Sequence, residues 1–312
     1  MGTEAVLGTS RPRLTPLVAA VAVALGVLIV APLFFSWANL VNLLRQVAIN
    51  GVIASGMTVV IIAGGFDLSV GATAALAGVL AVNCARAGLF AGIMVPLLAG
   101  AAVGALNGLL VSRAAINPLI ATLGMRYAVY AAANLFTAGF IQVNARPEFV
   151  ILGRGSAAGV PSTAIVFLAV ALLVHVLLRY TSAGSAIYAV GSNEGAAFFS
   201  GISTARVRTA TYALSGACAA LAGVVLASRS SAAAPDGGEG FELEAIAAVV
   251  VGGVSIFGGS GSILHTLMGV FLLGIVNNVL VLAKQPYEMH RIATGVILVA
   301  AIAFDAYRRG RH

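Results

Sequence analysis

The sequence predicts an all-α protein that crosses a membrane about ten times. Of its 312 residues, 60% are apolar and only 9% are charged, and the mean hydropathy is +1.05. These values lie far outside the range of soluble globular domains. The apolar runs have the length of a membrane-spanning helix, about twenty residues, whereas the strands of a membrane barrel would show about ten residues of alternating character.

Ten spans are expected from a hydropathy window of about 19 residues. They cover residues 14–35, 47–63, 68–84, 89–111, 117–138, 161–179, 209–227, 243–258, 262–283 and 290–306. Glycine pairs interrupt the pattern beside the short third and eighth spans, so the count is open by one or two. The first span follows two arginines as a signal peptide would, but it is too long for a cleaved segment. No stretch between spans is long enough to fold alone, so residues 1–312 are expected to form one transmembrane domain with a tail at 1–13.

Basic residues indicate the orientation of the chain. The net charge is +7, and all but one of the 17 basic residues are arginines, mostly at the ends of spans. With a cytoplasmic N-terminus, nine basic residues face the cytoplasm and seven the outside, and both termini carry arginine clusters. We therefore expect both termini to be cytoplasmic. The scattered arginines do not form the basic patch that binds nucleic acid.

Residue patterns typical of an enzyme are missing from the sequence. The four histidines share no metal-binding spacing with one another or with an acid or thiol. The single lysine, Lys284, lies outside any G-x-x-x-x-G-K-[ST] segment, so the chain has no P-loop for ATP. Cys84 and Cys218 lie in apolar stretches, as small buried thiols do. We expect no catalytic residues, no metal and no cofactor in this chain.

Short segments of the two halves resemble each other. Gly65-Phe66-Asp67-Leu68 and Gly240-Phe241-Glu242-Leu243 each place an acid ahead of an Ala-rich run. Two further pairs are Asn107-Gly-Leu-Leu-Val with Asn277-Asn-Val-Leu-Val, and Ala121-Thr-Leu-Gly with Ala293-Thr-Gly. Five predicted spans separate the two acids, and an odd number turns the second copy upside down, which predicts an inverted repeat. Asp67 would then face the cytoplasmic side and Glu242 the outside.

The two acids are interpreted first as structural. A carboxylate just ahead of a helix accepts hydrogen bonds from the free N–H groups of the first turn and meets the positive end of the helix dipole. Asp67 and Glu242 are therefore expected to cap helices, and the helix after Asp67 is expected to begin close to the bilayer. The alternative is an ion or proton site, because an acid within a membrane is a functional hypothesis by default.

Polar residues within spans are candidates for a translocation pathway. They are Asn50, Asn107, Arg126 and Asn277. Arg126 lies about two turns into its span, where a guanidinium either reaches the interface or lines a polar cavity. The asparagines could instead bond one helix to another, which is their commoner role. Glycines at 100, 104 and 108 recur every four residues and allow close packing of a second helix, within the chain or in another subunit.

The segment 184–208 is the longest predicted cytoplasmic loop. Within it, Ser192 or Asn193 can cap a short helix that ends before Gly201 and displays Phe198 and Phe199. Too few basic residues surround this helix for it to bind a lipid surface. A groove in a partner protein is the better explanation for a short apolar helix in the cytoplasm.

Four segments in register, residues 56–72, 107–124, 188–202 and 241–261, resemble the permeases of ABC importers for ribose and related monosaccharides. The resemblance covers residues from about 40 to 306. It implies a multi-pass protein of the bacterial inner membrane that moves a sugar by alternating access. It also implies three partners besides membrane lipid: a cytoplasmic ATPase, a second identical or different permease, and a periplasmic or lipid-anchored sugar-binding protein.

The resemblance also implies a role for the loop helix as the coupling helix that docks into the ATPase. The residues expected to carry this coupling are Asn193, Glu194, Ala197, Phe198, Phe199 and Gly201. Phe66 and Gly195 depart from the family's usual pattern, and so does Arg126. An ion-coupled secondary transporter, with Asp67 or Glu242 as the coupling acid, remains the alternative, and a membrane enzyme is a weaker one. The identity of the solute is left open.

Overall fold

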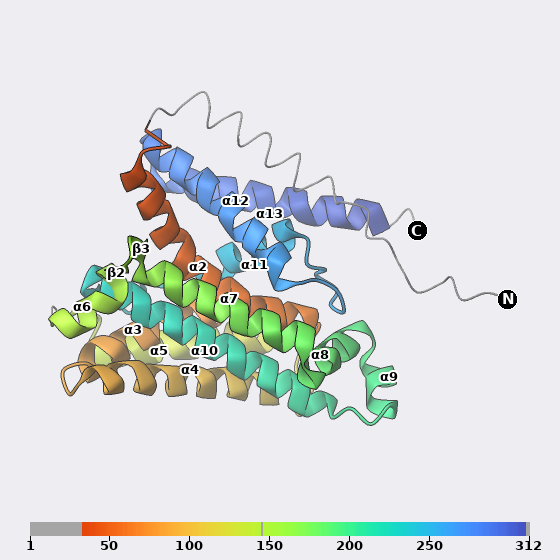
Figure 1. Ribbon diagram of the computed structural model, residues 1–312. Helices are drawn as coiled ribbons and strands as arrows, with labels where there is room; N and C mark the ends of the chain where they lie inside the picture. The colour runs from red at the N-terminus through yellow and green to blue at the C-terminus, as the bar shows by residue number, and fades with distance from the viewer. Residues whose placement is uncertain (1–32, 145, 310–312) are drawn as a thin grey trace.

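The computed structural model describes residues 33–144 and 146–309, and these are almost entirely helical (Figure 1). The helices are α2 (Trp37–Ile62), α3 (Val70–Cys84), α4 (Leu89–Ser112), α5 (Pro118–Thr137), α6 (Pro147–Arg154), α7 (Ser162–Tyr180), α8 (Ser182–Ser192), α9 (Glu194–Phe199), α10 (Thr204–Ser230), α11 (Phe241–Gly252), α12 (Ile263–Leu282) and α13 (Tyr287–Arg309). Two-residue strands form two small ladders. They are β1 (Gln142–Val143) with β4 (Ala232–Ala233), and β2 (Ser156–Ala157) with β3 (Val160–Pro161).

The prediction of a helical membrane protein is confirmed. Within the described ranges, six helices are long and apolar enough to cross a membrane: α2, α4, α5, α7, α10 and α12. Helix α3 is apolar but has only 15 residues. Nine helices match nine of the predicted ranges, and the described total of twelve exceeds ten because α6, α8 and α9 are short helices between them. The predicted tail 1–13 and nearly all of the predicted span 14–35 lie outside the described residues.

Two predicted spans differ from the structure by six residues or more at one end. Helix α2 begins at Trp37, ten residues before the prediction, because Ser36 caps it and Asn39 bonds to Asn278 of α12 at 2.9 Å. Polar residues in this first half lower the hydropathy without breaking the helix. Helix α11 ends at Gly252, six residues early, because Gly253 adopts the left-handed conformation with φ +97° that terminates a helix.

Helix α10 packs against three helices from the first half of the sequence, α2, α3 and α4. The glycines of α4 make this packing close, because a Cβ at Gly104 would collide with the carbonyl oxygen of Tyr212. Gly100 and Gly108 approach α10 in the same way. The small-residue stripe of α4 therefore serves packing within the chain, the first of the two uses expected from the sequence.

Apolar side chains cover much of the outer surface of the long helices. Leu98 of α4, Leu135 of α5 and Leu172 of α7 are 70%, 84% and 62% exposed. Such a surface suits lipid contact rather than water. The main apolar core lies between α2, α7, α10, α11 and α12.

Candidate functional site

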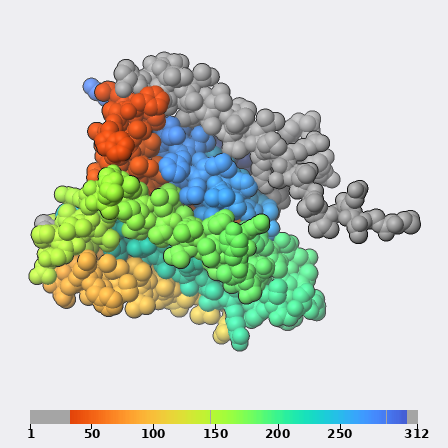
Figure 2. All heavy atoms as spheres, viewed as in Figure 1, coloured from red at the N-terminus to blue at the C-terminus, as the bar shows by residue number. Residues whose placement is uncertain are grey.

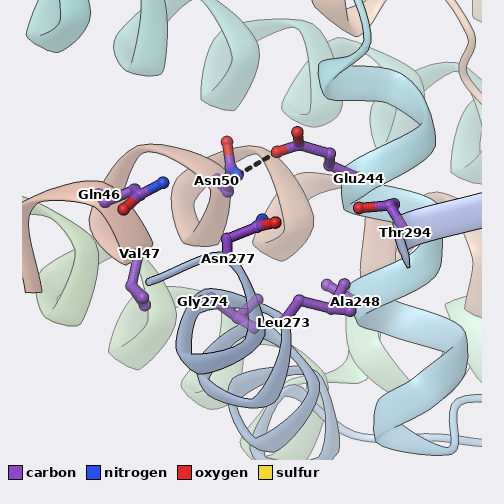
Figure 3. Close-up of a pocket in the computed structure, with 10 residues that line it drawn as sticks. Gln46, Val47, Asn50, Glu244, Ala248, Leu273, Gly274, Asn277 and Thr294 are labelled. Atoms are coloured by element: carbon purple, nitrogen blue, oxygen red, sulfur yellow. Dashed lines mark hydrogen bonds between the residues drawn. The ribbon is translucent and has the colours of Figure 1, made fainter. Parts of the chain in front are cut away.

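A polar pocket lies between α2, α11, α12 and α13 (Figure 3). The polar groups that line it are Gln46, Asn50, Glu244, Asn277 and Thr294, and apolar side chains close its floor. Its volume of about 20 Å³ is room for about one water molecule. In this conformation the pocket is therefore too small for a sugar.

One hydrogen bond crosses this pocket. The Asn50 amide of α2 donates to the carboxylate of Glu244 on α11, and Figure 3 shows Asn277 beside this pair. The structure thus brings together two of the four candidate pathway residues, Asn50 and Asn277. It adds Glu244, which the sequence analysis missed, although its position two residues after Glu242 at the start of an apolar helix was a usable signal.

Arg126 forms an ion pair instead of lining the pocket. Its guanidinium lies 3.1 Å from the carboxylate of Glu242, and the Arg126 side chain is one-quarter exposed while Glu242 is 2% exposed. The guanidinium also lies 5.7 Å from the ring centroid of Tyr130. Helix α5 is thereby tied to the first turn of α11, where Glu242 is the second helical residue and Gly240 the N-cap.

Asp67 is a buried polar hub, and the expectation of a simple helix cap was wrong for it. The N-cap of α3 is Ser69, and Asp67 accepts hydrogen bonds from the backbone N–H and the hydroxyl of Ser69 at 3.0 and 2.6 Å. It also accepts from Ser215 of α10 at 3.0 Å and from Asn107 of α4 at 3.4 Å. Asn107, the third pathway candidate, therefore joins helices in this cluster. It does not line the polar pocket between α2, α11, α12 and α13.

The inverted-repeat argument expected Asp67 and Glu242 to lie at opposite ends of the bundle. In the structure they lie near each other instead. The carboxylate of Glu242 lies beside Gly71, where a Cβ would collide with it. Gly71 follows Asp67 by four residues, which is about one helical turn. The two connections 63–69 and 231–240 thus meet near the first turn of α3, because Gly238 and Glu242 both lie against Gly71.

The segment expected to couple to an ATPase contains two consecutive short helices at one end of the bundle (Figure 1). Asn193 ends α8 and caps α9, and its side chain accepts the N–H of Ala196 at 2.9 Å. Ala197 is buried, whereas Phe198 and Phe199 are 64% and 89% exposed. Gly201 ends the turn with φ +84°.

An ion pair holds α9 against the start of α10. The carboxylate of Glu194 lies 2.8 Å from the guanidinium of Arg208. The helix is therefore fixed at its cap and at its first residue, while its two aromatic rings point away from the rest of the chain, as their exposure shows.

A bundle of long apolar helices, with short helices that begin inside it beside buried acids, defines a polytopic membrane transport protein. The chain belongs to the family described as the permease component of branched-chain amino acid transport systems, whose model matches residues 39–302. The resemblance seen in the four sequence segments is confirmed by its relatives. This is a family of transporters and not of enzymes.

Three relatives illustrate the likeness. The ribose import permease protein of Bacillus subtilis (strain 168) is 40% identical over 281 residues, which cover 89% of this chain and 87% of the relative. The D-allose transport system permease protein of Escherichia coli (strain K12) is 35% identical, with 87% and 84% covered. The L-arabinose ABC transporter permease protein of Azospirillum brasilense is 36% identical, with 90% and 83% covered. No solved structure matches the chain.

Proposed function

We propose that this chain is the transmembrane subunit of an ATP-driven importer for a monosaccharide or a related polar small solute. The observation that carries the proposal is α9, a capped and ion-paired helix that exposes Phe198 and Phe199 at one end of the bundle. Exposed aromatic rings on a rigid short helix suit a groove in a protein partner. Because the sequence has no P-loop, that partner is the subunit that hydrolyses ATP.

The solute class follows from the relatives. Their names assign them to ribose, D-allose and L-arabinose. The pocket of carboxamide, carboxylate and hydroxyl groups in Figure 3 has the hydrogen-bonding chemistry that a polyhydroxylated solute needs. Asn50, Asn277 and Glu244 are proposed to lie on the pathway in the conformation that opens it, with Arg126 and Asn107 at its border.

In the proposed orientation, α9 lies in the cytoplasm of a bacterium and the chain lies in its inner membrane. Arg206 and Arg208 at the start of α10 lie on the same side as α9, which agrees with the excess of basic residues in cytoplasmic loops. Both termini then also lie in the cytoplasm. The opposite side, with α6 and the two small ladders, faces the binding protein.

An inverted repeat of α2–α5 and α10–α13 is proposed within a layout of about ten membrane segments. Helix α3 packs against α4 and α5, as α11 packs against α12 and α13. Helix α10 packs against α4, as α2 packs against α12. Asp67 bonds to α4 and α10, and Glu244, two residues after the acid that the sequence pairs with Asp67, bonds to α2 and lines a pocket with α12.

The proposed assembly contains four kinds of component. They are two permeases, identical or different, a cytoplasmic ATPase, a sugar-binding protein that is periplasmic or lipid-anchored, and the surrounding lipid. Nucleic acid has no part in it. An ion-coupled secondary transporter is not favoured, because the relatives include a protein named as an ABC transporter permease.

Uptake by cells that express the chain with its ATPase and binding protein tests the proposal. The probes are radiolabelled ribose, D-allose and L-arabinose, the sugars in the relatives' names. We expect uptake of at least one of them to stop when ATP is depleted and to continue when the proton and sodium gradients are collapsed. The opposite pattern would establish ion coupling and refute the proposal.

A further inference from the structure

Four glycines bring three distant segments into backbone contact beside α9. Gly64 lies in the connection from α2 to α3, Gly191 lies in the last turn of α8, and Gly258 and Gly259 lie in the connection from α11 to α12. We call these four residues the glycine junction. Figure 2 shows the green atoms of this end of the molecule bordering the blue atoms of the C-terminal helices.

At three glycines of the junction, Gly191, Gly258 and Gly259, the contacts leave no room for a side chain. A Cβ at Gly191 would collide with the carbonyl oxygen of Ile62 and would lie 2.7 Å from the backbone nitrogen of Gly259. That nitrogen donates a hydrogen bond to the same Ile62 carbonyl at 2.9 Å. A Cβ at Gly258 would lie 2.9 Å from the carbonyl oxygen of Gly191 and 3.0 Å from the Cα of Gly64. Each of the three segments therefore touches the other two.

A side-chain hydrogen bond reinforces this contact. The hydroxyl of Tyr188 on α8 donates to the carbonyl oxygen of Gly261 at 2.8 Å. Helix α8 lies outside the six long apolar helices, and burial raises the pKa of the Tyr188 phenol. The phenol keeps its proton at neutral pH and can therefore donate this bond from α8 to the α11–α12 connection.

The glycine junction connects α9 to the segments that adjoin α3 and α11. Helix α8 ends at Ser192 and the next residue, Asn193, caps α9, so no flexible linker separates Gly191 from α9. On the other side, the α2–α3 connection carries Asp67, and the α11–α12 connection continues from the helix that carries Glu242 and Glu244. Backbones packed without intervening side chains do not slide independently, because interiors at crystal-like density have no slack.

We propose that the glycine junction transmits displacement of α9 to the start of α3 and to the end of α11, so that the α2–α3 connection, the α11–α12 connection and α8 move as one unit during transport. Gly191 is a positioning residue in this scheme, since it acts through the segments that it holds together. The inference rests on the proposed function, in which an ATPase moves α9.

Substitution of Gly191 tests the proposal, with Gly124 of α5 as the matched control. A Cβ at Gly124 would meet nothing within 4 Å, and Gly124 lies outside α9 and the glycine junction. In proteoliposomes with the ATPase and the binding protein, we expect Gly191→Ala to retain the ATPase and its hydrolysis. It should import at least tenfold less sugar per ATP, measured with the sugar that the complex imports best. Gly124→Ala should keep the full ratio, and full transport by Gly191→Ala would overturn the proposal.

A crosslink that leaves all four glycines in place decides the matter if Gly191→Ala does not fold. Ser192→Cys and Ser260→Cys, in a chain with Cys84→Ala and Cys218→Ala, place two thiols across the α8 contact with the α11–α12 connection. A short reducible crosslinker should leave transport within twofold of the unlinked value, because the joined segments move together. Loss of transport that returns on reduction would show that they separate. Failure of the proposed function would look different, since the unmodified chain would then capture no ATPase.

Discussion

The guanidinium of Arg126 lies 3.1 Å from the carboxylate of Glu242, and this pair joins α5 to the first turn of α11. The arginine is one-quarter exposed and the glutamate is buried. The pair therefore gives a buried acid a cationic partner. Without a partner, a charged carboxylate among apolar helices costs several kcal/mol, or the acid takes up a proton. The pair also places α5, α11 and the start of α3 in one contact region.

Replacing Arg126 by methionine should destabilise the folded protein by about 2 kcal/mol, because Glu242 stays buried without its cation. The measurement is thermal or denaturant unfolding in detergent. The double variant Arg126→Met with Glu242→Gln should recover most of the loss, since no unpaired charge remains. The single variant Glu242→Gln completes the comparison. If the loss of stability in the double variant equalled the sum of the losses in the two single variants, the ion pair would have no coupling energy.

Replacing Asp67 by alanine should cost about 3 kcal/mol of folding stability. The change removes the acceptor shared by Ser69, Ser215 and Asn107 and leaves four donors without it, because Ser69 donates both its backbone N–H and its hydroxyl. Asp236→Ala, at an exposed position in the turn before α11, is the control and should have no measurable effect. Equal unfolding curves for the two variants would contradict the role of Asp67 as a hub.

Replacing Gly104 by alanine should destabilise the contact between α4 and α10, because a Cβ there would collide with the backbone of Tyr212. Overpacking of this kind typically costs about 1–3 kcal/mol. Gly124→Ala on α5 is the matched control, since a Cβ there meets nothing within 4 Å. We expect the control to be neutral or slightly stabilising. Comparable losses for both would mean that helix packing does not depend on this approach.

Replacing Phe198 by aspartate should leave folding unchanged and abolish coupling to the ATPase. The side chain is 64% exposed, so little of the core depends on it, but a charge in a desolvated groove opposes docking. Co-purification of the ATPase should fall at least tenfold, and sugar uptake should fall with it. Phe198→Leu, which keeps an apolar group, should retain partial binding. Normal uptake by Phe198→Asp would exclude α9 as the docking helix.

Replacing Glu244 by glutamine should preserve the hydrogen-bonded shape of the pocket and remove its charge. If the pocket opens onto the solute pathway, loss of a charge-assisted bond to a sugar hydroxyl should lower transport about tenfold, equivalent to ~1.4 kcal/mol. Asn277→Ala should act in the same direction. The measurement is initial uptake rate against external sugar concentration, with unfolding curves as the control for stability. Unchanged uptake in both variants would remove these residues from the pathway.

Much of the architecture could be predicted from the sequence because it depends on local composition. Long apolar runs predict long helices, and the structure has helices at all nine predicted ranges that it describes. The cap at Asn193 and the stop at Gly201 follow from residue types that satisfy or turn a helix end wherever they occur. The family resemblance likewise rests on segments that are contiguous in the chain.

The partners of the polar residues could not be predicted, because they come from distant parts of the chain. Glu244 meets Asn50 across 194 residues and Asp67 meets Ser215 across 148. Nothing in the local sequence of α11 distinguishes the acid that faces α5 from the acid that faces α2.

By itself, the sequence determined that this protein is a helical membrane permease, since hydropathy and helix signals are properties of short stretches. Only the tertiary structure decided which acids are paired, bonded or placed at a pocket, and which glycines touch. A buried polar group takes its role from the partners that packing brings to it, and those partners are set by how the helices cross.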